Sequence, residues 1–422
     1  MAHVLLIGRG PLPQPGHHQT GFAQLRTRHF LQVLQQAGHS VDTVLIADDH
    51  APGLLSTTRA AAQCADVVVS AGPHRPASVA VAAARAGQPL WIDLPGDPLS
   101  ELQALALVLG TDLPPERRAE VHAMARASLS RADHLSVISR PQQHAAIGQL
   151  SLLGRIDHIP APVSVIPIAY DFPFPPRAPR RIPSAGPVIL ALSGAFAPWF
   201  DDETLADGLE RALKACPRLH VRVTGGGVPG HYTAGYERFQ RWAEASSAAD
   251  RIHLHGWVPH DQVPTILGAA HIGLCIDRPG SEPILGSRTR VLLFTWLGLH
   301  LVASPTTDLV ADLVAHELCI PIPPGTAGPA LADRLVKLVE EPPPPERVAA
   351  AHTHLATRYA PTTTCDALLD FVHAPSVLPV TADPVALVTR ELETVREALT
   401  AVHGSPTWRL LSRIHGLLPG DS

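Results

Sequence analysis

The sequence predicts an α/β protein built from two Rossmann-like, doubly wound parallel sheets that face a common cleft. Short apolar runs alternate with helical patterns over residues 1–171, a segment rich in proline and arginine follows at residues 172–187, and the alternation restarts over residues 188–373. Such alternation is typical of parallel sheets covered by helices on both faces. We therefore expect two domains joined by a proline-rich linker, with a ligand between them at the carboxyl ends of the strands.

The first domain is expected to open with a strand at residues 3–8 and a helix at residues 21–37 that ends at Gly38. The N-terminus has neither a charged region nor a long apolar region, so we expect a strand there and not a signal peptide. Further apolar runs predict the other strands of this domain, at residues 41–47, 66–70, 89–93 and 134–139.

The second domain is expected to start with a strand at residues 188–193 and a helix at residues 202–215. Its other strands are predicted at residues 220–224, 251–256, 272–276 and 301–304. Three consecutive glycines begin at Gly225, directly after one of these strands. Glycine lets the backbone approach a diphosphate closely, and a plain turn explains the same residues equally well.

Composition excludes several classes of protein. A net charge of -5 gives no general attraction for nucleic acid, so any phosphate must be bound locally. The five cysteines are widely separated and form no CxxC pair, which disfavours disulfides and zinc sites and indicates a reducing, cytoplasmic compartment. The longest apolar run is too short and too interrupted to span a bilayer.

The loop from Glu282 to Arg290 carries the strongest functional signal. It delivers Glu282, Ser287, Arg288, Thr289 and Arg290 to the start of an apolar helix. A helix N-terminus offers partial positive charge and unpaired N–H groups to a phosphate, and arginine adds a full charge and bidentate contacts. The upstream carboxylate suits sugar hydroxyls. The loop therefore predicts a nucleotide-sugar diphosphate site, the alternative being a solvated capping turn.

A second group of carboxylates follows the strand at residues 89–93. Asp93, Asp97 and Glu101 lie at its carboxyl end, where ligands bind in such folds. Asp97 either caps the next helix or contacts sugar hydroxyls and the reacting centre. Both interpretations stay open at the level of sequence.

Cofactor and metal signals are weak. Gly8 and Gly10 form a partial glycine-rich turn that lacks the third glycine of a dinucleotide fingerprint, so NAD is not expected. The sequence contains no D-x-D triplet, and the histidine pairs at residues 253–255 and 352–354 lack further ligands at zinc spacing. We expect no metal in the reaction and no cofactor apart from a nucleoside-diphosphate sugar as donor substrate.

Taken together, these motifs resemble the two-domain (GT-B) glycosyltransferases of family-4 type from bacterial glycan and polysaccharide biosynthesis. The resemblance covers most of residues 1–373. Its motifs occur in the expected order: Asp97-Pro with Glu101, residues 132–139, Gln142, residues 148–150, Gly154-Arg155, residues 199–205, residues 256–259, residues 288–292 and residues 296–298.

The resemblance implies a role for each domain. The first domain, residues 1–171, would hold the acceptor, with Asp97 facing it and Gly21 approaching the donor phosphate. The second domain, residues 188–373, would hold the nucleotide-sugar. The positions implied to contact the donor there are Gly194 and Gly225 in loops, Trp257 and Val258 near the base, Glu282 at the sugar, and Ser287, Arg288, Thr289 and Arg290 at the diphosphate.

The activity implied is transfer of a hexose-type unit from a nucleoside-diphosphate donor to a carbohydrate or lipid-linked acceptor, with retention at the anomeric carbon and without a metal. Two departures from the family pattern leave alternatives open. No basic residue follows Gly194 closely, and Leu293 replaces an acid that holds the ribose. The alternatives are an epimerase or phosphorylase on the same fold, and a degenerate subunit that binds the sugar nucleotide without turning it over.

The C-terminal tail, residues 383–418, is predicted to be helical. A heptad seam that begins at Val385 and ends at Val402 favours either packing on the same chain or a homodimer. A basic amphipathic stretch that begins at Trp408 and ends at Leu418 favours either packing or peripheral contact with the inner face of a membrane.

Overall fold

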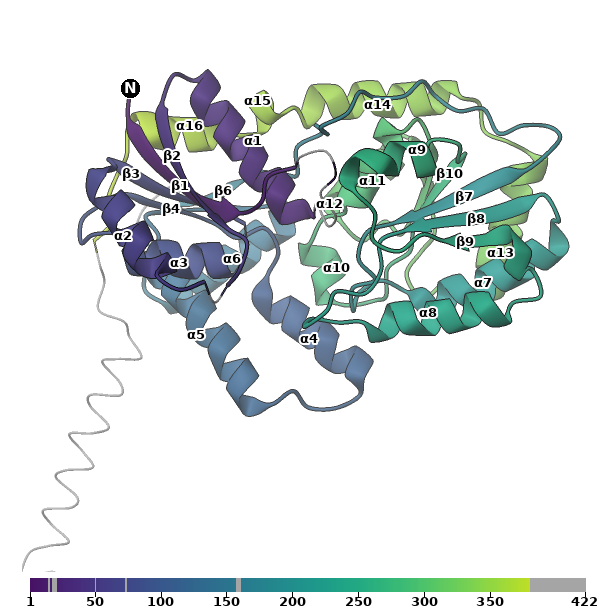
Figure 1. Cartoon of the computed structure of the whole chain (residues 1–422), viewed down its shortest axis with the longest axis horizontal. Helices are drawn as coiled ribbons and strands as arrows, with labels where there is room; N and C mark the ends of the chain where they lie inside the picture. Colours follow the sequence, from purple (N-terminus) through teal and green to yellow (C-terminus); the bar gives the residue numbers. More distant parts are fainter. Residues whose placement is uncertain (14–15, 17–20, 50, 73, 157–160, 380–422) are drawn as a thin grey trace, which may run out of the picture.

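The computed structural model describes residues 1–13, 16, 21–49, 51–72, 74–156 and 161–379. Two parallel six-stranded sheets, each flanked by helices, lie side by side (Figure 1). This arrangement confirms the predicted fold class. The predicted helices of the tail lie outside the described residues.

The first sheet has the strand order β2-β1-β3-β4-β5-β6. The chain enters at β1 and moves first to one side and then to the other, so the order reverses between β1 and β3. Its most apolar strand, β3, is buried at every position, as expected for a parallel sheet covered on both faces. The strands are β1 (His3–Arg9), β2 (Ser40–Ile46), β3 (Val67–Ala71), β4 (Leu90–Asp93), β5 (His134–Val137) and β6 (Val163–Val165).

The second sheet has the order β12-β11-β10-β7-β8-β9, so its order reverses between β7 and β10. Open parallel sheets bind ligands outside the carboxyl ends of the strands at such a reversal. The strands are β7 (Val188–Ser193), β8 (Leu219–Thr224), β9 (Ile252–Leu254), β10 (Ile272–Cys275), β11 (His300–Ala303) and β12 (Ile320–Pro321).

Helices connect the strands of each sheet and cover both faces. Those of the first domain are α1 (Phe22–Gln36), α2 (Leu54–Cys64), α3 (Arg75–Ala83), α4 (Pro98–Leu109), α5 (Pro115–Arg131) and α6 (Arg140–Leu152). Those that follow in the second are α7 (Asp202–Ala215), α8 (Ala234–Ala245), α9 (Val263–Leu267), α10 (Ser281–Leu285), α11 (Thr289–Trp296), α12 (Asp308–Ala315) and α13 (Gly328–Glu340), with single 3-10 turns at Ala249–Arg251 and His260–Gln262.

The strands that the sequence predicts are all present, within two residues at each end. Sequence analysis missed β6 and β12. Both lie at a sheet edge and pair with one neighbour. Because β6 has three residues and β12 has two, neither is long enough to show a strand pattern.

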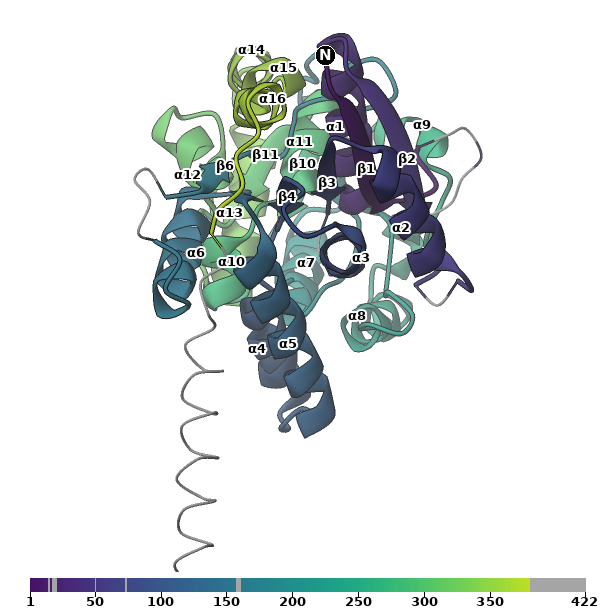
Figure 2. The same cartoon turned by 90° about the vertical axis from the view of Figure 1, so that its left-hand side faces the viewer.

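The last three described helices return the chain to the first domain. They are α14 (Glu346–Arg358), α15 (Pro361–Thr364) and α16 (Asp366–His373), which follow one another along the top of the molecule (Figures 1 and 2). Leu368 and Phe371 of α16 belong to the core that contains Phe30 and Trp91. The sequence assigned residues up to 373 to the second domain, whereas α16 completes the core of the first.

The predicted linker at residues 172–187 contains no helix or strand and packs against the end of α11. The backbone N–H groups of Arg177 and Arg180 donate to the carbonyls of Trp296 and Gly298 at 2.8 and 2.7 Å. Gly298 has φ of +76°, and a Cβ there would lie 2.2 Å from the carbonyl oxygen of Ala178. A glycine is therefore required where the linker crosses the helix end. Within the described ranges, no helix combines the length and apolarity needed to cross a bilayer.

Candidate functional site

A cavity of about 290 Å³ lies between the two domains. The first domain contributes the start of α1, the loops after β4 and β5, and Ile168. The second contributes the loops after β7 and β8, the segment before α9, and the α10–α11 loop. The cavity thus lies at the carboxyl ends of strands from both sheets, next to the reversal between β7 and β10.

Most residues predicted from the sequence lie together in this cavity. Those that line it are Gly21, Gly194, Gly225, Trp257, Val258, Glu282, Ser287, Arg288, Thr289 and Arg290. Asp97 is not among the lining residues.

Gly194 and Gly225 bring the backbones of two loops into contact. The N–H of Gly194 donates to the carbonyl of Thr224 at 2.9 Å, and Gly225 has φ of +95°. A Cβ on Gly225 would lie 2.2 Å from the carbonyl oxygen of Gly194. Only glycine permits this approach. The cavity wall at these two loops is therefore formed by backbone atoms without side chains.

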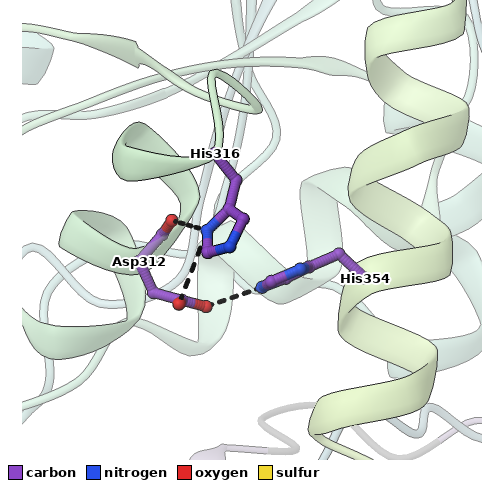
Figure 3. A group of neighbouring side chains, drawn as sticks. All are labelled: Asp312, His316 and His354. Carbon is purple, nitrogen blue, oxygen red and sulfur yellow. Dashed lines mark hydrogen bonds and ion pairs between the residues drawn. The ribbon is translucent and has the colours of Figure 1, made fainter.

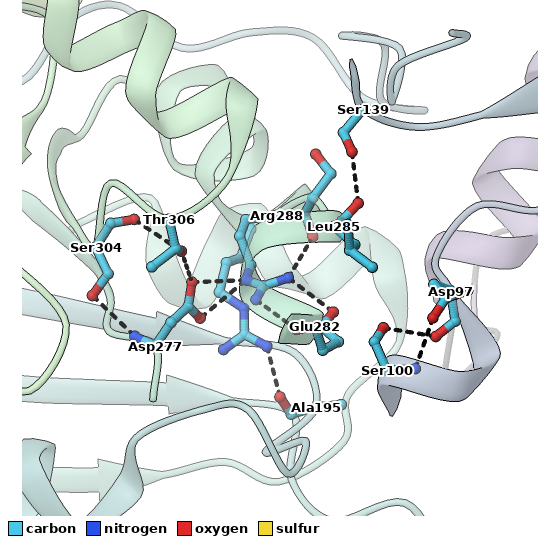
Figure 4. Close-up of polar contacts among 12 residues, drawn as sticks. Asp97, Ser100, Ser139, Ala195, Asp277, Glu282, Leu285, Arg288, Ser304 and Thr306 are labelled. Carbon is cyan, nitrogen blue, oxygen red and sulfur yellow. Dashed lines mark hydrogen bonds and ion pairs between the residues drawn. The ribbon is translucent and has the colours of Figure 1, made fainter. Parts of the chain in front are cut away.

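Arg288 lies between two carboxylates in the interior (Figure 4). Its Nε is 3.0 Å from both carboxylate oxygens of Asp277, and its Nη1 and Nη2 lie 3.2 and 2.8 Å from Oε1 and Oε2 of Glu282. Thr306 also donates to Asp277 at 2.8 Å. The guanidinium is therefore largely engaged by the protein, and its main effect is to fix the position of Glu282.

Burial and the neighbouring charges shift the pKa values of Glu282 and Arg288. Burial raises the pKa of Glu282 to about 7, against the opposing effect of Arg288. Burial alone would lower the pKa of Arg288, but the charges of Asp277 and Glu282 outweigh it, and the net pKa is raised. Arg288 therefore stays charged and opposes the effect of burial on Glu282.

Arg290 has different surroundings, two residues farther along. Its Nη2 donates to the carbonyl of Ala195 at 2.6 Å, and its guanidinium carbon lies 4.6 Å from the centre of the Phe200 ring. Its Nη1 is buried and has no hydrogen-bond partner in the part of the chain that the structure describes. Burial lowers the pKa of Arg290, and no carboxylate is paired with it among the described residues. This Nη1 is a charged donor that lacks a protein acceptor, which is what an anionic ligand requires.

The carboxylates after β4 have three different environments. Asp93 is buried against Arg26, with Oδ1 2.7 Å from Nη2. Asp97 caps α4 by accepting from the backbone N–H of Ser100 at 2.8 Å, and Gln149 donates to its other oxygen at 3.2 Å. Glu101, one turn into α4, lines the cavity. The structure thus places Glu101, and not Asp97, opposite Glu282 across the domain boundary.

The end of the cavity near Leu293 is apolar. Leu293 belongs to a buried cluster with Leu25, Ile168, Phe172 and Val263, and all five line the cavity. Trp257 lies at the cavity edge and donates from Nε1 to the carbonyl of Gly227 at 2.7 Å. The cavity therefore has a charged end at Arg290 and Glu282 and an apolar end.

Asp277 was not predicted from the sequence, and Glu101 was predicted only as one of three carboxylates after a strand. Asp277 directly follows a predicted strand, which is a usable signal for a site residue. The signal for Glu101 was its helical spacing from Asp97, since a residue one turn beyond a cap is free to face the ligand. Nothing in the sequence indicates that Arg288 pairs with carboxylates while Arg290 stays available for a ligand.

Comparison with known proteins supports the fold. No protein-family model and no curated protein matches the sequence. The chain is similar to the crystal structure of HepE from Anabaena in complex with UDP-glucose, with a TM-score of 0.59 and 16% identity over 89% of this chain and 100% of the other. It is also similar to sucrose-phosphate synthase from Thermosynechococcus elongatus, with a TM-score of 0.60 and 16% identity over 89% and 100% of the two chains.

A third similar structure is AviGT4, a glycosyltransferase involved in avilamycin A biosynthesis, with a TM-score of 0.53 and 17% identity over 90% of this chain and 100% of the other. Identity at this level establishes architecture alone. The chain therefore has the two-domain fold of the GT-B glycosyltransferases.

Proposed function

We propose that the protein transfers a sugar from a nucleoside-diphosphate donor to a carbohydrate or lipid-linked glycan acceptor. The observation that carries the proposal is Arg290, whose buried Nη1 has no partner among the described residues and lies in a cavity at the carboxyl ends of both sheets. The similarity to HepE, which was crystallised with UDP-glucose, supports a nucleotide-sugar as the ligand.

The two ends of the cavity suit the two ends of such a donor. The diphosphate would lie against Arg290, the N-terminus of α11 and the bare backbone at Gly194 and Gly225. The nucleoside would occupy the apolar end, with its base near Trp257 and Val258. The sugar would then lie on the other side of the diphosphate, near Glu282.

Glu282 would accept hydrogen bonds from the donor sugar. Arg288 occupies one direction at each carboxylate oxygen, which leaves a lone pair on each for a hydroxyl group. Glu101 reaches the cavity from the first domain, so it is the carboxylate that we place on the acceptor side. Asp97 would support Glu101 by capping α4.

Transfer breaks the bond between the anomeric carbon and the diphosphate and forms a bond from that carbon to an acceptor oxygen. Arg290 would stabilise the negative charge that gathers on the leaving diphosphate, the task that a metal performs in other transferases. We infer that the reaction retains the anomeric configuration and needs neither metal nor resident cofactor. It would take place in the cytoplasm, as expected from the sequence.

Replacing Arg290 tests the proposal. Binding of UDP, GDP, ADP and TDP is measured by calorimetry, and nucleoside-diphosphate release from the matching sugar donors is followed with and without glycan acceptors. The Arg290→Ala variant is expected to lose about 100-fold or more in turnover. Arg211→Ala serves as the control, because Arg211 lies on the surface of α7, away from the cavity lining, and forms an ion pair with Asp207.

The outcomes separate the alternatives. Acceptor-dependent release of the nucleoside diphosphate supports the transferase. Isomerised donor without release indicates an epimerase, release that requires inorganic phosphate as the acceptor indicates a phosphorylase, and binding without any turnover across the panel indicates a binding subunit. Unchanged turnover in Arg290→Ala would remove the arginine from the proposed site.

A further inference from the structure

Two histidines and an aspartate converge on the surface of the second domain, outside the lining of the donor cavity. Asp312 lies in α12, His316 follows the end of that helix, and His354 lies in α14 (Figure 3). One ligand atom from each residue lies within 4.8 Å of the other two. We propose that these three side chains bind a divalent transition metal ion, with zinc as the reference case.

The side chains are already held in a suitable orientation. The Nε2 of His354 lies 2.7 Å from Oδ2 of Asp312, and the Nδ1 of His316 lies 3.7 Å from Oδ1. The imidazole rings of the two histidines are 4.6 Å apart. Zinc holds its ligands at about 2.0–2.2 Å, so the three side chains would rotate toward a common point when the ion binds.

The tautomer of His316 favours metal binding. Its Nδ1 lies 2.8 Å from the backbone carbonyl oxygen of Asp312, the geometry of an Nδ1–H donor. This hydrogen bond leaves the lone pair on Nε2, so Nε2, and not the Nδ1 atom that lies 3.7 Å from Oδ1 of Asp312, would be the ligand atom of His316. Histidines that bind metals commonly donate their other ring nitrogen to a carbonyl or carboxylate in this way.

The ligand types select the class of ion. Two imidazoles and one carboxylate suit zinc and neighbouring transition metals and do not suit calcium or magnesium, which prefer oxygen ligands. Asp312 also lines a second cavity of about 240 Å³. Neither histidine lines that cavity, so the water molecules that complete the coordination would come from the solvent at His316, whose side chain is 52% exposed.

Arg358 competes with the ion for Asp312. Its Nη1 lies 3.3 Å from Oδ1, but 60% of its side chain is exposed, so it can swing into solvent when the ion binds. The positive charge of Arg358 opposes the ion. Removing this charge should therefore increase the affinity for the metal.

Metal binding would link α12 to α14, the helix that begins the return to the first domain. His352, two residues before His354, already contacts Tyr170 at 2.7 Å from the opposite side of α14. The ion would therefore stabilise the attachment of this helix on its other side. The inference concerns the fold and does not depend on the proposed transferase activity.

The test uses the full-length protein, freed of metal with a chelator and titrated with zinc chloride by calorimetry. We expect one tight equivalent per chain and a higher midpoint of thermal unfolding. Both effects should be lost in His316→Ala and His354→Ala, with affinity reduced about 100-fold or more. Because 52% of the His316 side chain is exposed, its replacement leaves the fold intact.

Two further variants sharpen the test. Arg358→Ala is expected to bind zinc more tightly than the wild type, and weaker binding would contradict the assigned position of the ion. His253→Ala removes an exposed histidine of the pair at residues 253–255 and should bind zinc like the wild type. Equal zinc affinity in wild type, His316→Ala and His354→Ala would overturn the proposal and leave Asp312 as the centre of an ordinary ion-pair cluster.

Discussion

Arg288 lies between two carboxylates, whereas the Nη1 of Arg290 has no partner within the described ranges of the chain. A buried charge that loses its partner is strongly destabilising, because the remaining charge stays desolvated. Asp277 and Glu282 both depend on Arg288 for compensation. Arg288 therefore contributes mainly to the stability of the fold, whereas Arg290 is available to bind a ligand.

This difference leads to a prediction for matched variants. Arg288→Met should lower the free energy of unfolding by about 3–5 kcal/mol, since it leaves two carboxylates buried without their cation. Arg290→Met should cost less stability and instead remove nucleoside-diphosphate binding. Urea unfolding and calorimetry measure the two effects, and equal losses of stability in both variants would contradict the assignment.

Leu293 is a second single residue whose side chain affects which ligand groups the cavity can bind. Its buried cluster with Leu25 and Val263 offers no acceptor to a ribose hydroxyl. A hydroxyl buried there without a partner costs about 1–3 kcal/mol. If the nucleoside occupies this end of the cavity, we expect Leu293→Glu to bind UDP more tightly than the wild type. The control is Leu292→Glu in the adjacent buried core, which should lower stability without increasing the affinity for UDP. Unchanged UDP affinity in a folded Leu293→Glu variant would place the nucleoside elsewhere.

At the scale of elements, the loops after β7 and β8 form one wall of the cavity. Their contact depends on Gly225, which leaves no space for a side chain beside the Gly194 carbonyl. The α10–α11 loop and the start of α11, which carry Arg288 and Arg290, adjoin this wall, because Arg290 donates to the carbonyl of Ala195 in the loop after β7. The site therefore depends on the relative position of three loops, each anchored by a buried strand or helix.

Replacing Gly225 by alanine tests the role of this wall. The clash at 2.2 Å should displace the Gly194 loop and abolish nucleoside-diphosphate binding. Gly186→Ala is the matched control, because Gly186 also has a positive φ, of +79°, but has no neighbour within 4 Å. The control should lose about 1 kcal/mol from backbone strain and keep its binding. Retained binding in Gly225→Ala would show that the loop contact is dispensable.

At the scale of the whole molecule, several histidines are held neutral by burial. Burial lowers the pKa of His29 to about 3, and that of His134, His260 and His300 to about 4. The unfolded chain binds protons at these positions below pH 6.5, while the folded chain does not. The contribution of these histidines to stability is therefore fully present above pH 6.5 and is lost as the pH falls toward 4. The raised pKa of Glu282 acts in the opposite direction between pH 4.5 and about 7, but it is a single group.

The pH dependence can be assigned to individual histidines. His134 stacks on Trp91 with ring centres 4.5 Å apart, so phenylalanine preserves the packing and removes the titration. Urea unfolding at pH 7 and pH 5 should show a smaller loss of stability in His134→Phe than in wild type, by up to about 1.4 kcal/mol per pH unit. Equal losses in the two proteins would mean that His134 is not a source of the acid sensitivity.

Local patterns were sufficient to predict much of the protein from the sequence. Apolar runs fixed the central strands, because a strand buried on both faces must be apolar throughout. The loop from Glu282 to Arg290 was recognisable because two arginines at the positively polarised start of an apolar helix suit an anionic ligand. The edge strands β6 and β12 carried too few residues for a pattern, and the tail predictions lie outside the described residues.

The sequence by itself determined the two repeated sheets and the residues that gather at the domain boundary, since these follow from local periodicity and from chain order. Only the tertiary structure decided which of those residues pair with one another and which face the cavity. Asp277 and Glu282 neutralise Arg288, Asp97 caps a helix while Glu101 faces the cavity, and His354 meets Asp312 and His316 across two helices. The pairings of Arg288 with Asp277 and Glu282 span 11 and 6 positions, and that of His354 with Asp312 spans 42, so simple periodicity does not predict them. Their energies also depend on burial, which no local pattern encodes.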